Sequence, residues 1–277
     1  MASRKRGGTS SIASFFGAKA RKGSDADKIK CKLAAKASAA KEVVTTESPH
    51  PESNPSAEAL ATALSDATGK VVKPVYMTND CKSWYLLSRR YLPTPDKAAF
   101  EEQWDLHPSE YHQIRMFGKL VNESRWSQSW GVAYRYSSTV NTERPLHENA
   151  VVMDLIGAAN NLVGCVHLGA PYNGCLQNWY EPFHKIGLHS DDEKSLLREV
   201  PIFSLSWGGP RRFLFRARPN SPSPCLRAID EIMLLDGDLL VMGGDLQLSH
   251  KHEIPAVRRT LDPPTARRIN WTIRAFR

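Results

Sequence analysis

The segment Arg268-Ile-Asn-Trp-Thr-Ile-Arg274 is the clearest indication of a β fold, because its polar and apolar residues alternate without a break. Successive side chains of a β-strand point to opposite faces, so this segment would carry four polar residues on one face and three apolar residues on the other. The alternation predicts a strand that packs on a core with its apolar face.

Further strands are expected upstream of this segment, as short apolar runs divided by Gly, Pro, Asn and Asp. The runs are 175–180, 201–207, 211–217, 229–235 and 238–242. Helical patterns come earlier, at 96–104 after Pro95 and at 145–163, where Pro145 suits a first turn. Helices followed by many short strands predict an α+β, mainly β fold: a helix-backed β-sandwich or jelly roll.

The composition is basic, with a formal net charge of +8 and a pI near 9.3 over 277 residues. This balance favours polyanionic partners, of which nucleic acid is the commonest. No run of 18 apolar residues occurs, so no membrane span is expected.

Residues 1–72 differ from the rest, since they are rich in Ala, Ser, Lys, Thr, Glu and Pro. Residues 1–41 hold eleven Lys and Arg against two acids. Such a segment buries too little apolar surface to offset its ordering entropy, so we expect a disordered basic tail. A single folded domain would then occupy 73–277.

A metal site is indicated by His189 and Asp191, which would share one face of a strand, and by the distant His252. Two histidines and one carboxylate leave three positions of an octahedral ion open, the pattern of non-heme Fe(II) oxygenases. A pair of surface polar residues is the ordinary alternative for His-x-Asp alone. Zinc is a lesser rival, because the motif has no thiolate.

Arg268 and Arg274 share the polar face of the terminal segment. A guanidinium binds carboxylates bidentately and keeps its charge when enclosed, which suits a dianionic co-substrate. The alternative is a solvated basic face, as expected for the neighbouring Arg258, Arg259, Arg267 and Arg277.

Taken together, six ordered motifs resemble the AlkB family of Fe(II)/2-oxoglutarate dioxygenases, over about residues 75–277. They are Asn178-Trp-Tyr180, His189-Ser-Asp-Asp-Glu193, Pro201–Gly208, Arg212-Phe213 with Phe215-Arg216, Gly237–Gly244 and Arg268–Arg274. The segment Met116-Phe-Gly-Lys119 resembles the nuclear DNA-repair branch of that family. The resemblance implies a double-stranded β-helix, or jelly roll, backed by helices.

The same resemblance implies that His189, Asp191 and His252 hold Fe(II), with 2-oxoglutarate and O2 as co-substrates. His252 fits the third ligand better than His250 because it precedes a short apolar step and a proline. Arg268 would clamp the remote carboxylate of 2-oxoglutarate. The remaining residues expected in the co-substrate pocket are Asn178, Tyr180, Thr272 and Arg274.

Substrate residues are implied in the same way. Asp192 would contact the exocyclic amine of the damaged base, with Glu193 in support. Tyr134 and Tyr136 would bind the base, which Tyr136 and His189 would stack from opposite sides. Phe117 and Gly118 would form a hairpin tip that enters the duplex. Met116 stands where the family has a β-branched residue, so strand selectivity stays open.

The implied activity is oxidative demethylation of 1-methyladenine and 3-methylcytosine in DNA by a monomeric enzyme. Such a base must be flipped out of the stack to reach a buried metal ion. One alternative is an RNA demethylase of the same family. Another is a catalytically inactive protein that binds nucleic acid or a sliding clamp.

The tail holds one motif, Thr9–Phe16, which resembles a PCNA-interacting peptide through Ile12, Phe15 and Phe16. One aliphatic and two aromatic residues on a short helical turn would enter an apolar pocket of the clamp. Thr9 replaces the expected glutamine, and a chance Phe-Phe pair is the alternative. The basic residues around it predict a nuclear location, or an organelle if the segment is a transit peptide.

Overall fold

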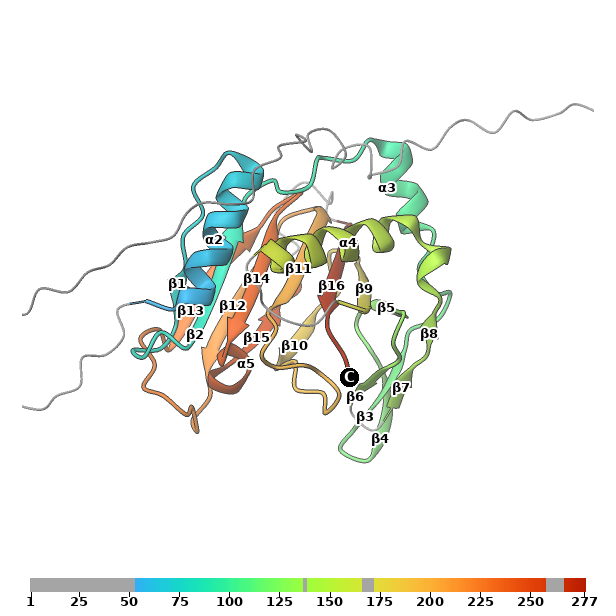
Figure 1. The fold of residues 1–277 in the computed structure, drawn as a ribbon. Helices are drawn as coiled ribbons and strands as arrows, with labels where there is room; N and C mark the ends of the chain where they lie inside the picture. Colours follow the sequence, from blue (N-terminus) through green and yellow to red (C-terminus); the bar gives the residue numbers. More distant parts are fainter. Residues whose placement is uncertain (1–52, 137–138, 166–171, 258–266) are drawn as a thin grey trace, which may run out of the picture. The chain divides into compact units, whose positions relative to one another are not determined.

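The computed structural model describes residues 53–136, 139–165, 172–257 and 267–277. Its framework consists of two sheets that face each other and whose strands pair mostly in antiparallel fashion (Figure 1). The major sheet contains β1 (Val75–Tyr76), β2 (Ser83–Ser88), β14 (Leu239–Gly244), β11 (Ile202–Gly208), β16 (Arg268–Arg274), β9 (Gly174–Tyr180), β5 (Trp126–Trp130) and β8 (Glu143–Arg144), in that order. The minor sheet contains β10 (Ile186–His189), β15 (His250–Ile254), β12 (Arg211–Ala217) and β13 (Ile229–Leu234).

The core between the sheets combines residues of both, such as Tyr85, Leu240 and Met242 with Phe213 and Phe215. Tyr85 stacks on Phe215 with ring centroids 5.2 Å apart. From β9 to β16 the chain passes back and forth between the two sheets. This arrangement is the mainly β, helix-backed jelly roll that the sequence predicted.

Strand β16 lies at the centre of the major sheet, paired with β11 and β9. All seven of its residues are buried, including both arginines. Ile269, Trp271 and Ile273 are fully enclosed. The alternation was therefore predicted correctly, and the polar face lines an interior cavity, which rules out the alternative of a solvated basic face for Arg268 and Arg274.

The outer face of the major sheet is covered by α2 (Pro55–Thr68) and α4 (Ala150–Cys165), as Figure 1 shows. Helix α4 contacts β9 and β16. The sequence placed its start at 145, but 146–148 form a 3-10 turn and α4 begins only after Asn149, whose side chain accepts from the backbone N–H of Val152. Helix α3 (Lys97–Trp104) begins after Asp96 as expected.

Helix α2 corrects the predicted boundary of the tail. Asn54 caps it, Gly69 ends it in the left-handed region, and the face of Ala57, Leu60 and Leu64 is fully buried. The Ala-rich composition suggested disorder, but leucines at helical spacing pack against the sheet, where α2 contacts β2. Folded structure therefore begins near residue 54 and not at 73. Residues 1–52, including the 9–16 motif, lie outside the described residues.

Two small hairpins project from the same end of the jelly roll (Figure 1). They are β3 (Gln113–Met116) with β4 (Lys119–Asn122), and β6 (Tyr134–Tyr136) with β7 (Thr139–Asn141). A short helix, α5 (Leu246–Ser249), precedes β15. Among the described residues, no helix is long and apolar enough to cross a membrane.

Candidate active site

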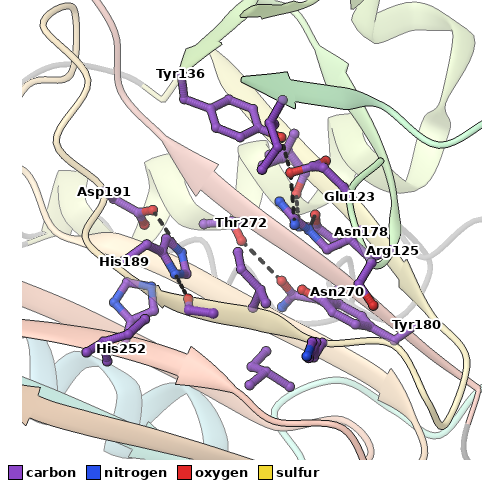
Figure 2. A pocket seen from close by; sticks show the side chains of 18 of the residues that line it. Glu123, Arg125, Tyr136, Asn178, Tyr180, His189, Asp191, His252, Asn270 and Thr272 are labelled. Carbon is purple, nitrogen blue, oxygen red and sulfur yellow. Dashed lines mark hydrogen bonds and ion pairs between the residues drawn. The ribbon is translucent and has the colours of Figure 1, made fainter. Parts of the chain in front are cut away.

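Three predicted metal ligands meet at one end of the minor sheet. His189 ends β10 and lies opposite His252 of β15 in the antiparallel register. Asp191 follows His189 by two residues, and one ligand atom of each residue lies within 4.8 Å of the others. The His189 and His252 ring centroids are 4.3 Å apart, and His189 Nε2 is 3.9 Å from Asp191 Oδ1 (Figure 2).

Burial and charge make this group a cation site. Asp191 is 1% exposed; its Oδ1 lies 2.8 Å from Arg274 Nη2, and its Oδ2 has no hydrogen-bond partner within the described chain. Burial would raise the pKa of Asp191, but Arg274 and the two histidines outweigh it and hold that pKa at about 2. Burial lowers the pKa of His252 to about 3. An ionised carboxylate between neutral imidazoles is the protonation state that binds a divalent cation.

The orientation of the histidines supports the same assignment. His189 Nδ1 lies 2.9 Å from the carbonyl oxygen of Gly187, which leaves Nε2 to face the ion. His250, the alternative ligand, lies two residues before His252 on β15, opposite Ala217 and not opposite His189. Its ring nitrogens lie 2.8 Å from Ser249 Oγ and 2.8 Å from the Arg227 carbonyl.

A cavity of about 670 Å³ opens from the metal group between the two sheets. Its floor comes from the major sheet and its far wall from the hairpins. The lining includes the residues expected for metal, co-substrate and base: His189, Asp191, His252, Asn178, Tyr180, Thr272, Arg274, Tyr134 and Tyr136.

Arg268 sits beside this cavity and is 1% exposed. Its Nη2 donates to Ser206 Oγ at 2.8 Å, while Nε and Nη1 have no hydrogen-bond partner in the described chain. Its guanidinium carbon lies 5.3 Å from the ring centre of Tyr180. Burial lowers the pKa of Arg268 to about 10, so it remains cationic at neutral pH. A buried guanidinium with open donors fits a carboxylate.

The predicted substrate residues divide into two groups. Tyr134 and Tyr136 lie on the cavity wall. Asp192 is exposed and does not line the cavity, and Glu193 is half-buried beside Tyr134. Phe117, at the tip of the β3–β4 hairpin, is 99% exposed, and together with Gly118 it has positive φ.

Sequence reasoning missed a second buried ion pair on the wall. Glu123 Oε1 lies 3.0 Å from Arg125 Nη1, and both side chains are almost fully enclosed. The only signal was an acid and a base two residues apart just before Trp126, and such a spacing is typical of surface pairs. Figure 2 shows the pair between Tyr136 and Asn178.

Comparison with known proteins agrees with this geometry. A family model described as the 2OG-Fe(II) oxygenase superfamily matches residues 95–274. The match covers more than half of the chain and contains the metal group and both arginines. The chain therefore belongs to the 2OG-Fe(II) oxygenase superfamily, whose cofactor is Fe(II) and whose co-substrates are 2-oxoglutarate and O2.

Individual relatives place it in the AlkB family within that superfamily. The DNA oxidative demethylase ALKBH2 of Mus musculus is 27% identical over 180 residues, which are 63% of this chain and 71% of that protein. ALKBH2 of Homo sapiens is 30% identical over 58% of this chain and 60% of its own length. The alpha-ketoglutarate-dependent dioxygenase AlkB of Salmonella typhimurium is 36% identical over 37% of this chain and 44% of its own length.

Proposed function

We propose that this protein oxidatively demethylates N-alkylated bases, with 1-methyladenine and 3-methylcytosine in DNA as substrates. The observation that carries the proposal is the buried group of His189, Asp191 and His252 in a cavity whose wall also contains two tyrosines, Tyr134 and Tyr136. The ALKBH2 relatives are named for DNA demethylation, which supports DNA as the substrate here.

The residues of the metal group would hold Fe(II) through His189, Asp191 and His252. With 2-oxoglutarate and O2, the ion supplies hydroxylation of the N-methyl group, and the products are succinate, CO2 and a base that loses formaldehyde. Arg268 binds the far carboxylate of the oxoacid through its free Nε and Nη1 donors. Arg274 keeps Asp191 ionised, and so keeps the metal group anionic.

The wall of the cavity binds the base. Tyr134 and Tyr136 are 4.7 Å apart between ring centroids and tilted at 47°. Tyr136 stacks on the flipped base and His189 closes the opposite side. Stacking of this kind is worth about 1–3 kcal/mol per base and accepts any aromatic heterocycle, so selection among bases requires polar groups as well.

The β3–β4 hairpin fills the space that the flipped base leaves. Met116 is 48% exposed, Phe117 is 99% exposed and Leu120 is 53% exposed, which forms an apolar tip without internal packing. Unstacking a base costs a few kcal/mol, and burial of a phenylalanine recovers about 1.5–3 kcal/mol. Insertion of Phe117 between base pairs therefore offsets a large part of the cost.

Matched methylated DNA and RNA oligonucleotides of one sequence test the proposal. We expect release of one formaldehyde per succinate on DNA with 1-methyladenine or 3-methylcytosine, and slower release on RNA. Faster turnover on RNA would make the protein an RNA demethylase. Absence of succinate with every methylated oligonucleotide, in the presence of Fe(II), would leave only a nucleic-acid-binding module.

A further inference from the structure

Glu123 places a carboxylate in the wall of the cavity, where the side chain is only 2% exposed. It follows β4 and precedes β5, and its backbone N–H donates to His112. A charge at this depth is costly unless hydrogen bonds and an opposite charge satisfy it. Here both oxygens are engaged, which makes the carboxylate a fixed point of the wall.

One partner of Glu123 is the tyrosine expected to stack on the base. The Tyr136 hydroxyl donates a short hydrogen bond to Glu123 Oε1, as Figure 2 shows. Burial, and then the nearby carboxylate, raises the pKa of Tyr136, so its hydroxyl stays protonated and remains a donor. The ring of Tyr136 is thus held at its far end as well as at its backbone.

The other partner leads to the floor of the cavity. Arg125 Nη1 pairs with Glu123 Oε1, and Arg125 Nε donates to Asn178 Oδ1 at 2.8 Å. Asn178 lies on β9 and lines the part of the cavity expected to hold the co-substrate. Ser127 Oγ satisfies the remaining Glu123 oxygen at 3.0 Å. Tyr136, Glu123, Arg125 and Asn178 therefore form one continuous polar chain.

We propose that Glu123 is a positioning and specificity-determining residue, which fixes Tyr136 for stacking on the substrate base and links it through Arg125 to Asn178. A purely structural role does not require this arrangement, because apolar side chains of similar volume often stabilise a protein as well as a buried ion pair does. The inference rests on the proposed function for the identity of the base.

Equilibrium binding tests this role without turnover. The full chain is loaded anaerobically with Mn(II), and the affinities for 2-oxoglutarate and for a single-stranded oligonucleotide with one 3-methylcytosine are measured. The unmethylated oligonucleotide gives the selectivity. Tyr136→Phe removes only the hydroxyl, and Glu123→Gln keeps the shape of the side chain while removing its charge.

We expect Tyr136→Phe to lower methyl selectivity about tenfold, the loss typical of one hydrogen bond to a charged group, and to leave 2-oxoglutarate affinity unchanged. Glu123→Gln should lower both affinities. The double variant should be no less selective than Glu123→Gln alone, because both substitutions break the same hydrogen bond between Tyr136 and Glu123. Glu231→Gln, which breaks an exposed pair with Arg212, is the matched control.

Wild-type selectivity in both variants, or losses that add in the double variant, would overturn the role of Glu123. If the wild-type protein itself shows no preference for the methylated oligonucleotide, the proposed substrate is wrong. The 2-oxoglutarate measurement then still decides the link to Asn178. A loss in Glu123→Gln but not in Glu231→Gln supports that link, and equal affinities reject it.

Discussion

Arg274 Nη2 lies 2.8 Å from Asp191 Oδ1, and neither side chain is more than 4% exposed. Two charges buried this deeply are stable only as a pair. Asp191 Oδ2 nevertheless has no hydrogen-bond partner in the described chain, so it keeps its lone pairs for an ion. Arg274 thus sets the charge of the metal group without occupying its ligand positions.

The Arg274–Asp191 pair predicts how metal affinity depends on pH. In the wild type, Asp191 with a pKa of about 2 and His252 with a pKa of about 3 are both deprotonated at pH 5, and burial also lowers the pKa of His189, so Mn(II) affinity should change little between pH 8 and 5. Without Arg274, burial raises the pKa of Asp191. Arg274→Met should then lose Mn(II) affinity steeply as the pH falls, as measured by calorimetry. Arg274→Lys keeps a cation and should retain most of the wild-type profile; a flat profile for Arg274→Met would contradict this account.

Arg268→Lys should raise the KM for 2-oxoglutarate. A lysine cannot offer the planar fork, and a lost charged hydrogen bond costs about 1.5–3 kcal/mol, or roughly 10-fold to 100-fold in affinity. Steady-state succinate formation measures the effect. The neighbouring Arg267 pairs with Glu101 outside the cavity, so Arg267→Lys should leave this KM unchanged. Equal effects of the two substitutions on this KM would show that Arg268 does not bind the co-substrate.

Phe117→Ala should reduce demethylation of a methylated duplex about tenfold more than demethylation of the single strand. The duplex alone needs an apolar side chain to fill the vacated stack. Phe183 is 66% exposed but lies outside the hairpin, between β9 and β10, so Phe183→Ala is the control. Equal losses on both substrates would show that Phe117 does not act as a wedge.

His184 predicts an acid-sensitive fold. It is 1% exposed, burial lowers its pKa to about 4, and its Nε2 lies 3.0 Å from the Tyr111 hydroxyl. In the unfolded chain His184 binds a proton near pH 6.5, whereas in the folded chain it binds one only near pH 4. The stability of the metal-free protein should therefore fall by up to about 3 kcal/mol from this group between pH 6.5 and 4, and not above pH 6.5.

Urea unfolding across this pH range measures that slope. The slope of the unfolding free energy against pH reports how many more protons the unfolded chain binds than the folded chain. His184→Gln should reduce that number by about one, whereas substitution of the exposed His147 by Gln should not change it. An unchanged slope in His184→Gln would mean that His184 is protonated in the folded state.

The fold was predictable wherever side chains repeat with a clear period. Strand β16 is the best case, since its alternation survives in the structure residue for residue. The sequence could not show that the polar face of β16 is inside, because alternation looks the same for a solvent face and a polar cavity. Helix α2 was assigned to the disordered tail for the opposite reason: its alanines resemble a disordered segment with transient helix at 57–67 until a sheet covers Leu60 and Leu64.

The metal group was predictable because its three ligands are chemically specific and one pair is only two residues apart. The Glu123–Arg125 pair was not, since the contact depends on how the β4–β5 connection turns into the cavity. His250 and His252 are two residues apart and so have the same strand parity, and the register of β15 separates them: His252 lies opposite His189, whereas His250 lies opposite Ala217.

We also propose that Ile12, Phe15 and Phe16 bind a sliding clamp and that the protein acts in the nucleus. The double substitution Phe15→Ala with Phe16→Ala should weaken binding to purified PCNA at least tenfold, because the two aromatic rings supply most of the buried apolar area. Formaldehyde release should not change. Wild-type clamp affinity in this variant would reject the motif.

An anaerobic crystal structure with Fe(II), 2-oxoglutarate and a DNA oligonucleotide containing 3-methylcytosine would show the metal ligands, the co-substrate clamp and the base pocket in a single experiment. We predict one iron bound by His189, Asp191 and His252, the far carboxylate of the oxoacid on Arg268, and the methylated base against Tyr136. Iron on other side chains, or a base that does not enter the cavity, would contradict the account.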